Sequence, residues 1–498
     1  MSTVTDEASP PPAGQAHDRH HGRRWLILAV IAPAQLMVVL DATIVNIALP
    51  SAQADLGFSN DSRQWIITAY SLAFGGLLLI GGRIADLVGR KLTLTIGLAG
   101  FAGASALAGA AGDFEILVTG RALQGVFGAL LAPTALALLN TTFTNAKERA
   151  TTFGIYGAVA GAGGGVGLLL GGLLTEHLDW RWCLYVNLLF AAVSLIGALV
   201  LLPRHRRDKA VKIDVPGTVV VTAGLFALVY GFAHAETDGW GSVGTWGFLA
   251  AGGVLIAVFA RLQTRVAHPL LPLRILLDRD RGASSVAIFI SAAGMFGVTL
   301  FLTYYLQQTL HYSPVKTGLA FLPMIAAVMV MSALSTTVLT PRLGPKPIVP
   351  VGMALSAAGL AWLTQLDAHS TYAAHILPPL LVFALGLGLI MAPSMSTATA
   401  GIDAADAGVG SASVNTMQQV GGSIGTALLS SLAASAATDY LAGRQPTPEA
   451  IGRSALESYS TAYWWSAAFF AAGMIICGLL FRRGKPAHDP DATPAVHM

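Results

Sequence analysis

The feature that most constrains this sequence is a series of long apolar runs recurring from one end of the chain to the other. A helix needs about 20 apolar residues to cross the roughly 30 Å hydrocarbon core of a bilayer, because its backbone groups must bond to one another where water is absent. Fourteen runs reach or approach this length, so the sequence predicts an all-α integral membrane protein with fourteen transmembrane helices. The second, eighth and eleventh runs are the shortest, so counts of twelve and thirteen stay open. The runs lie approximately at residues 25–49, 65–82, 92–112, 116–140, 151–174, 182–202, 215–234, 243–260, 283–306, 317–339, 348–366, 374–397, 409–435 and 460–481.

The composition excludes a soluble fold. Only 11% of the residues are charged and 54% are hydrophobic, whereas a soluble chain has about 25% charged residues to keep its surface in water. The net charge of +3 does not indicate a nucleic-acid partner, because the basic residues are spread over short loops. Cys183 and Cys477 both lie inside apolar runs, so we expect neither a disulfide framework nor a cysteine-type metal site. We also expect no other metal site and no cofactor.

The distribution of Lys and Arg predicts the orientation in the membrane. Cytoplasmic loops retain positive charge, and with the N-terminus placed inside, 23 of the 29 Lys and Arg residues fall on the inner side. Five fall on the outer side and Arg121 lies within a run. We therefore expect a multi-pass protein of the cell membrane with both termini in the cytoplasm. The loop around Asp403 and Asp406 is assigned to the inner side although it carries no basic residue.

The same reading divides the chain into segments. Polar residues 1–24 and 484–498 are predicted to be disordered cytoplasmic tails. Six apolar runs precede a basic loop that starts near residue 204, and eight follow it. The predicted division is an N-terminal six-helix bundle at 25–203, a basic loop with an inserted helix pair at 204–282, and a C-terminal six-helix bundle at 283–483.

Two charged residues, Asp41 and Arg121, lie inside apolar runs and belong to no loop. A charge at that depth costs about 2.5 to 3.5 kcal/mol, so both should face the bundle interior or a water-filled cavity. Their depths place both in the outer half of the membrane, where they could meet. Burial disfavours a charged Asp41 and a nearby Arg121 favours it, which is the balance that proton uptake and release require. The alternative is an inert ion pair that fixes helix register. Candidate polar neighbours are Asn46 and Gln124, which could equally be helix-packing residues.

The loop between the second and third runs reads GRIADLVGRK at residues 82–91. Its terminal glycines allow a tight turn, and its acid is placed to pair with cations or to cap a helix. This loop resembles the signature of the major facilitator superfamily, Gly-x-Leu-Ala-Asp-Arg-x-Gly-Arg-Lys. The resemblance implies a loop that latches two helix bundles on the cytoplasmic side. Its gate residues would be Gly82, Asp86, Gly89 and Arg90.

A weaker copy of the loop is expected in the second half. Aligning Gly344 with Gly89 places Lys346 opposite Lys91 but Pro341 opposite the acid.

Other segments are similar to the fourteen-helix drug:proton antiporter branch of that superfamily. Residues 40–50, LDATIVNIALP, resemble its first-helix motif, and residues 121–125, RALQG, match its fourth-helix motif. Trp180-Arg181-Trp182 with Asn187 also resembles the branch. The resemblance implies that Asp41 and Arg121 serve proton coupling.

The fifth run departs from the branch. Its antiporter motif carries Gly-Pro before a glycine pair, whereas Leu168 follows Gly167 here. Gly163, Gly167 and Gly171 still recur every four residues, with Gly172 next to the last. Such a face lets another helix approach closely. Close packing should therefore survive, while the proline kink is lost.

We therefore expect a secondary active transporter, and not an enzyme. It would act as a monomer and export hydrophobic or amphipathic small molecules, including antibiotics, by alternating access coupled to proton entry. The substrate cavity would lie between the bundles near the membrane midplane. Because of Leu168, a transporter of an endogenous metabolite with another coupling or direction is the alternative. A sensor or scaffold would not need a proton site, and the helices contain no set of residues typical of an enzyme.

Overall fold

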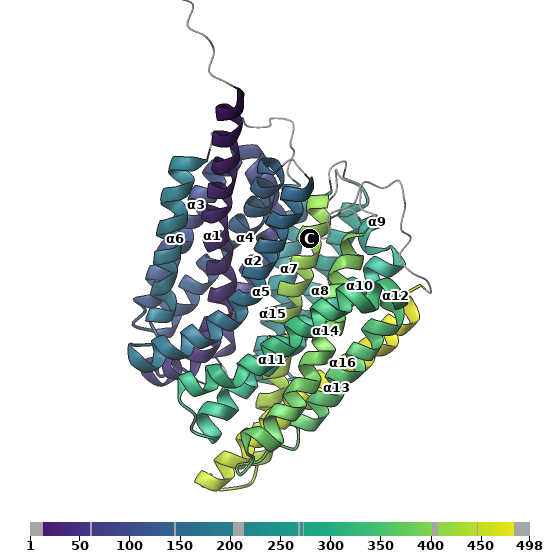
Figure 1. Ribbon diagram of the computed structural model, residues 1–498. Helices are drawn as coiled ribbons and strands as arrows, with labels where there is room; N and C mark the ends of the chain where they lie inside the picture. Colours follow the sequence, from purple (N-terminus) through teal and green to yellow (C-terminus); the bar gives the residue numbers. More distant parts are fainter. Residues whose placement is uncertain are drawn as a thin grey trace, which may run out of the picture.

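The computed structural model describes residues 13–59, 62–143, 146–202, 214–266, 269–271, 273–400, 407–445 and 447–482. Within these residues the regular structure is entirely helical, and fourteen helices have at least 19 residues (Figure 1). They are α1 (Ala13–Leu56), α2 (Gln64–Val88), α3 (Arg90–Gly109), α4 (Phe114–Thr142), α5 (Ala146–His177), α6 (Trp182–Leu201), α7 (Val215–Asp238), α8 (Val243–Gln263), α10 (Arg279–Tyr304), α11 (Pro314–Leu334), α13 (Pro345–Leu363), α14 (Leu377–Thr399), α15 (Ala407–Leu441) and α16 (Pro448–Leu480). The shorter elements are α9 (Leu273–Leu276), α12 (Thr340–Leu343) and the π-helical turns η1 (Tyr305–Thr309), η2 (Ser335–Leu339) and η3 (Tyr372–Ile376).

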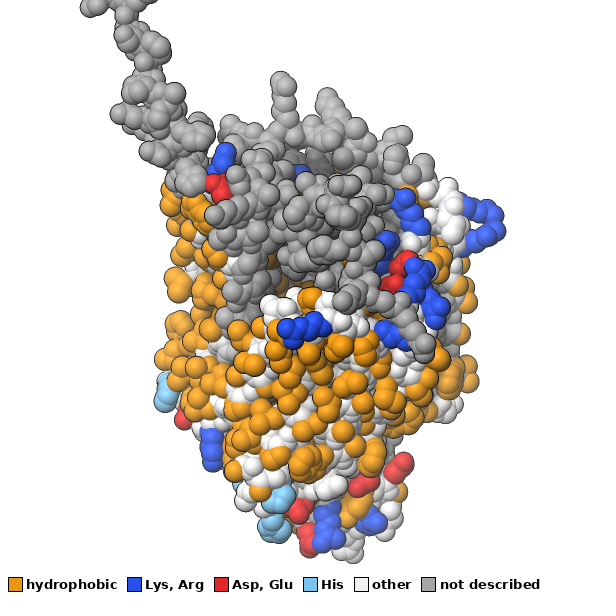
Figure 2. Space-filling view, turned by 45° about the vertical axis from the view of Figure 1, so that its right-hand side comes forward, with side chains coloured by type: hydrophobic (Ala, Val, Ile, Leu, Met, Phe, Trp, Pro, Cys, Tyr) orange, Lys and Arg blue, Asp and Glu red, His pale blue; other side chains and the backbone are white. Residues whose placement is uncertain are grey.

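Most of the long helices have the length and composition of membrane spans. Twelve spans among the described residues are long and apolar enough to cross a bilayer, and α2 adds a shorter apolar stretch, Gln64–Leu78. Apolar side chains such as Leu189, Ile196 and Val200 are mostly exposed on the outside of the molecule. Figure 2 shows hydrophobic side chains over the middle of the surface, with charged side chains gathered toward its two ends. The predicted class of all-α integral membrane protein is confirmed.

Each of the fourteen apolar runs coincides with one long helix, although several helices extend beyond the apolar residues. The helix α16 starts at Pro448, well before the run that begins near residue 460. Its start is set by Thr447, whose side chain accepts a hydrogen bond from the backbone N–H of Ala450. Polar turns therefore lengthen a helix beyond the part that apolar residues reveal.

The first helix corrects one boundary in the sequence analysis. The segment 1–24 was predicted to be a disordered tail, but α1 begins at Ala13. Alanine, glutamine and arginine in this segment are good helix formers, so the helix continues toward the N-terminus beyond its apolar part. The rest of the two predicted tails, residues 1–12 and 484–498, lies outside the described residues.

The long helices pack in two groups and a pair. In the N-terminal helix group, α1 to α6, α4 contacts α2 and α3, while α1 contacts α5 and α6. In the C-terminal helix group, α10 to α16, α10 contacts α14, α15 and α16, and α13 contacts α14 and α16. The pair α7 and α8 pack together, and α7 also contacts α2 and α15. The division into domains stays a prediction, and its first junction falls at residues 203–213, outside the described residues.

The two helix groups are bonded together toward one end of the molecule. We call this end, where α1 finishes and α2 starts, the distal end, and the end where α1 begins the proximal end (Figure 1). The bonds at the distal end come from side chains on both groups, so this end is closed in the structure. They run from Tyr304 Oη to Gln53 Oε1 (2.8 Å), from Gln307 Nε2 to the Ile47 carbonyl (3.1 Å) and from the Val315 N–H to Glu176 Oε2 (2.9 Å).

Glycines bring helices of the two groups into direct contact at two places. A Cβ on Gly75 of α2 would lie 2.8 Å from the Cβ of Gln419 on α15. A Cβ on Gly318 of α11 would lie 2.6 Å from the carbonyl oxygen of Leu168 on α5. Distances this short leave no room for a side chain, so α2 with α15 and α5 with α11 form the close junctions between the groups.

Candidate functional site

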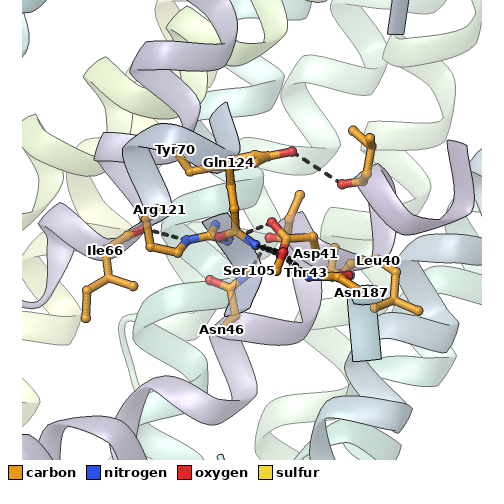
Figure 3. A network of polar contacts seen from close by, with 12 residues as sticks. Leu40, Asp41, Thr43, Asn46, Ile66, Tyr70, Ser105, Arg121, Gln124 and Asn187 are labelled. Carbon is orange, nitrogen blue, oxygen red and sulfur yellow. Dashed lines mark hydrogen bonds and ion pairs between the residues drawn. The ribbon is translucent and has the colours of Figure 1, made fainter. Parts of the chain in front are cut away.

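An acid and a base from different helices meet inside the N-terminal helix group (Figure 3). The Nη1 of Arg121 on α4 donates to the Oδ2 of Asp41 on α1 at 2.6 Å. Asp41 is 0% exposed and Arg121 is 1% exposed. A buried ion pair of this kind is stable only when other groups satisfy its remaining hydrogen-bonding capacity.

Amide side chains from two further positions complete the shell around the carboxylate. The Oδ1 of Asp41 accepts hydrogen bonds from Gln124 Nε2 at 2.9 Å and from Asn187 Nδ2 on α6 at 2.7 Å. Gln124 and Asn187 also reach the hydroxyl oxygen of Ser105 on α3, at 2.7 Å and 3.4 Å. Four helices thus contribute to one hydrogen-bonded network, which we call the Asp41 network: Asp41, Ser105, Arg121, Gln124 and Asn187.

Arg121 has partners besides the carboxylate. Its Nε donates to the backbone carbonyl of Ile66 at 3.1 Å, and its Nη1 donates to Gln124 Oε1 at 2.9 Å. Its guanidinium carbon also lies 4.5 Å from the centre of the Tyr70 ring, a cation–π arrangement. The base is therefore held by α2 and by its own helix even where its bond to Asp41 is lost.

The predicted glycine ridge of α5 positions α1. A Cβ on Gly167 would lie 3.0 Å from the carbonyl oxygen of Leu40, and one on Gly171 would lie 2.8 Å from that of Ile44. Gly163 similarly faces Val39. Because α5 covers this face of α1, the side chain of Asp41, on a neighbouring face, is directed at α4 and α6. Gly172, next in sequence, instead faces the carbonyl oxygen of Pro314 on α11.

In the fourth-helix segment RALQG, some residues form hydrogen bonds and another packs against a neighbouring helix. Arg121 and Gln124 belong to the Asp41 network, whereas Gly125 lets α4 approach the backbone of α2. A Cβ on Gly125 would lie 2.3 Å from the carbonyl oxygen of Tyr70. The same contact fixes the height of the Tyr70 ring beside Arg121.

Asn46, the other predicted neighbour, is not part of the network. Its Nδ2 donates to the carbonyl of Ala42 in its own helix at 3.2 Å. Sequence analysis did not find Ser105 or Tyr70, because serine and tyrosine in apolar helices carry no distinctive pattern. Asn187 was noted only as part of a longer resemblance, although a lone amide in an apolar run signals a buried partner.

The Asp41 network is sealed from solvent in this conformation. One turn from Asp41 lies a small cavity of about 10 Å³ whose lining, including Val45, Ile66 and Leu184, is apolar. Such a volume holds one water at most, and only where polar partners exist. Proton exchange with bulk water at Asp41 therefore requires another conformation.

The loop predicted as a gate joins α2 to α3. Gly89 has a φ of 102°, a value that strains other residues, and its N–H donates to the carbonyl of Ala85 at 3.0 Å. The Nη1 of Arg90 donates to the carbonyl of Ala137 on α4 at 3.2 Å. The side chain of Asp86 lies outside the described residues.

The close approach of α2 to α4 falls one residue away from the predicted Gly82. A Cβ on Gly82 would make an ordinary contact with Pro133 at 3.5 Å, whereas one on Gly81 would lie 2.0 Å from the carbonyl oxygen of Ala129. Gly81 is thus the packing residue, a distinction that two adjacent glycines in a sequence do not reveal.

The second half repeats the geometry of this loop. Gly344, between α12 and α13, has a φ of 75°, and its N–H donates to the carbonyl of Thr340 at 2.9 Å. Gly89 bonds in the same way to the residue four positions before it. The two aligned glycines therefore share one backbone conformation, with a positive φ and the same hydrogen bond.

Together the fold and the site define a class, that of multi-pass helical membrane proteins with a buried acid–base pair in the first of two helix groups. The family model described as Major Facilitator Superfamily matches residues 31–426. The chain belongs to this superfamily, as its loop and helix motifs predicted. It is a membrane transporter of small-molecule substrates.

Two named relatives match most or all of the chain. The puromycin resistance protein pur8 of Streptomyces alboniger is 46% identical over 100% of this chain and 99% of its own length. The tetracenomycin C resistance and export protein of Streptomyces glaucescens is 37% identical over 88% of this chain and 81% of its own length.

Solved structures share the fold. A bacterial homologue of the human lysosomal transporter Spinster, in an inward-facing and unoccupied conformation, superposes with a TM-score of 0.65. The match covers 93% of this chain and 99% of that one at 16% identity. At this identity the likeness shows the fold alone.

Proposed function

We propose that this transporter exports amphipathic, antibiotic-like molecules in exchange for protons. The names of both relatives include resistance, and one includes export. Such molecules are the substrates that we infer for this chain from the relatives at 46% and 37% identity. The proximal end, with both termini, would lie in the cytoplasm, and the transporter would work as a monomer in the cell membrane.

The observation that carries proton coupling is the asymmetry of the Asp41 network. Asp41 is the acid of the network, and protonation would weaken its charged bond to Arg121. Arg121 would keep its bonds to Ile66 and Gln124 and its contact with Tyr70. The charge therefore stays satisfied in both protonation states, which a merely structural ion pair does not need.

Proton entry can supply the energy for export. One charge that moves through 100 mV releases about 2.3 kcal/mol, in addition to the contribution of any pH gradient. In this scheme the sealed network corresponds to one state of Asp41, and a conformational change opens it for exchange. The link between α1 and α4 that protonation loosens would be the point of coupling.

We also propose the gating role of the loop between α2 and α3. Arg90 is anchored on the Ala137 carbonyl, so the loop moves together with α4. Gly82, Asp86 and Gly89 would complete a latch at the proximal end. Opening of that latch would alternate with the distal closure made by the bonds between the helix groups.

A specific observation supports the alternative of another cargo or direction. The helix α5 runs without a break from Ala146 to His177 and contains no proline. Leu168 stands where the antiporter motif carries proline, and it is buried against α11. A metabolite transporter with different coupling would fit a fifth helix that lacks this proline.

The decisive experiment measures puromycin uptake by everted membrane vesicles with and without a proton gradient. We expect gradient-dependent uptake in vesicles with this protein, and puromycin tolerance in a sensitive host. Asp41→Asn should abolish coupling, whereas the matched control Asp113→Asn should not, because that exposed residue caps α4 and asparagine caps equally well. Uptake that ignores the gradient would refute proton coupling, and no tolerance to puromycin or to a panel of other antibiotics would refute export.

A further inference from the structure

A second set of buried polar side chains lies between the helix groups, apart from the Asp41 network. Their polar oxygens have no hydrogen-bond partner in the part of the chain that the structure describes. The threonines and serines among them are between 0% and 4% exposed. We call this set the α2–α15 polar stripe: Thr68 and Ser71 on α2, and Gln419, Thr426 and Ser430 on α15.

The members of the stripe share one face of each helix. On α2, Thr68 and Ser71 precede the contact residue Gly75 by seven and four positions, which places all three on one side of the helix. On α15, Thr426 and Ser430 follow Gln419 by seven and eleven positions and likewise share its face.

The polar faces of α2 and α15 are opposite each other. Gly75 and Gln419 are in direct contact, and α2 starts at the distal end whereas α15 starts at the proximal end (Figure 1). In an antiparallel pair, moving from Gly75 toward the distal end along α2 corresponds to moving forward along α15. This register brings Thr68 level with Thr426, so hydroxyls line both sides of the junction.

The hydroxyls of the stripe differ from those buried hydroxyls of the chain that bond within their own helix. Thr299 and Thr303 on α10 donate to carbonyls one turn earlier in their own helix, at 2.8 Å and 2.6 Å. Thr134 on α4 does the same at 2.6 Å. A buried hydroxyl without a partner is unfavourable. At a position that only packs helices together, valine or alanine would therefore be at least as stable. The stripe keeps polar atoms at a place where this closed state does not use them.

The location of the stripe between the two helix groups indicates when its hydroxyls can find partners. The helix α2 belongs to the N-terminal helix group and α15 to the C-terminal one, and the distal bonds hold these groups together. A conformation in which the distal end opened by separation of α2 from α15 would expose the hydroxyls.

We propose that the α2–α15 polar stripe binds the hydrogen-bonding groups of the transported molecule, and that it is covered in the distal-closed state and exposed when α2 and α15 separate. The stripe contains no charged side chain, so it suits neutral groups such as hydroxyls, amides and sugars. A hydroxyl both donates and accepts, which permits different molecules to use the same wall. This inference rests on the proposed export function and names the part of the substrate that is recognised.

The first test removes the hydroxyls without changing shape. We expect the double variant Thr68→Val with Thr426→Val to raise the KM for puromycin about tenfold in everted vesicles, which corresponds to about two modest hydrogen bonds. The matched control, Thr299→Val with Thr303→Val, removes two self-paired hydroxyls and should leave KM within about twofold. Export of tetraphenylphosphonium, which has no hydrogen-bonding group, should be equal in wild type and double variant.

The results separate the two proposals. If wild-type vesicles do not accumulate puromycin, the proposed function fails and this inference fails with it. If wild-type vesicles accumulate puromycin and the stripe variant has an unchanged KM, only the stripe proposal is overturned. An equal rise in KM for the control variant would also overturn it.

The second test detects exposure directly. The single variants Thr68→Cys and Thr426→Cys, in a background with Cys183→Ala and Cys477→Ala, should react with a membrane-impermeant maleimide during turnover. The control variant Thr303→Cys should not react. Saturating puromycin should slow the labelling at both stripe positions at least about threefold. Absence of labelling, or labelling that puromycin does not slow, would show a packing face or a water path and overturn the proposal.

Discussion

Two sets of buried polar side chains in this protein are organised in opposite ways. In the Asp41 network, both carboxylate oxygens accept hydrogen bonds and the guanidinium has several partners. In the α2–α15 polar stripe, hydroxyls such as Thr68 and Thr426 face a neighbouring helix without using their polar atoms. Both sets sit in helices of the same apolar kind, so composition does not explain the difference.

Location explains it. The Asp41 network lies within one helix group, among α1, α3, α4 and α6, where an unpaired charge would be very costly. The stripe lies between the helix groups, and in our proposal its neighbours change during transport. Burying an unpaired hydroxyl costs far less free energy than burying an unpaired charge. A hydroxyl can therefore stay unpaired in one conformation and bond to a partner in another. The carboxylate of Asp41 is thus fully bonded within one helix group, whereas the hydroxyls of the stripe are unpartnered between two groups.

The largest effect should come from the acid of the network. Asp41→Ala leaves Arg121 buried beside an apolar gap, and we expect a loss of about 3 to 5 kcal/mol of stability. Asp41→Asn keeps two hydrogen-bonding atoms and should remain folded, but without proton-coupled transport. Thermal unfolding in detergent and vesicle transport would measure the two effects. Equal stability of the two variants would contradict the saturated-network description.

The next effect concerns the glycine face that positions α1. Gly167→Val places methyl groups against Thr43 and the Leu40 carbonyl, so we expect about 1 to 3 kcal/mol of destabilisation and loss of coupling. Gly164→Val is the matched control on the same helix, because no atom lies within 4 Å of its added Cβ. A control variant that is as unstable as Gly167→Val would show that α5 tolerates no branched residue, whatever its face.

A smaller effect is expected from the neutral part of the network. Asn187→Ala removes one donor to Asp41 and one contact with Ser105. The loss of a hydrogen bond to a charged group is worth about 1.5 to 3 kcal/mol, so proton-coupled uptake should fall about tenfold while the protein stays folded. Asn46→Ala, which removes only a bond within α1, is the comparison and should fall less. Equal losses would place Asn187 outside the functional network.

Mutations in the stripe should not lower stability, in contrast to mutations in the Asp41 network. Thr68→Val removes an unpartnered hydroxyl, so the thermal midpoint should stay constant or rise. Thr303→Val removes a paired hydroxyl and should lower stability by about 1 kcal/mol. Thermal unfolding of the purified variants would compare them. A clear loss of stability in Thr68→Val would mean that the hydroxyl already has a partner.

The smallest effect concerns the distal closure that covers the stripe. Glu176→Gln weakens the bond to the Val315 N–H at the start of α11. This contact is exposed, so little should change in folding, and the maleimide labelling of a cysteine at Thr426 should accelerate about twofold. Asp113→Asn, remote from the junction between the groups, should leave the labelling rate unchanged. Slower labelling in the Glu176 variant would contradict the assignment of this end as the closed gate.

Much of the fold could be predicted because apolar runs of membrane length leave few alternatives to helices. The site was partly predictable for a related reason: Asp41 and Arg121 were conspicuous as charges inside apolar runs. Ser105 and Tyr70 were not, because such residues occur throughout these helices and only their neighbours distinguish them. The start of α1 at Ala13 was missed because polar residues can extend a helix beyond the membrane.

By itself, the sequence determined the helical membrane class, the superfamily and the acid and base that must be buried. These properties follow from composition and spacing along one helix at a time, which a linear pattern records. Only the tertiary structure decided that the carboxylate of Asp41 receives bonds from three other side chains, and that Gly81 rather than Gly82 touches α4. It also separated paired from unpaired hydroxyls. Such features depend on the rotation and register of packed helices, and a difference of one residue, about 100° around a helix, changes every partner.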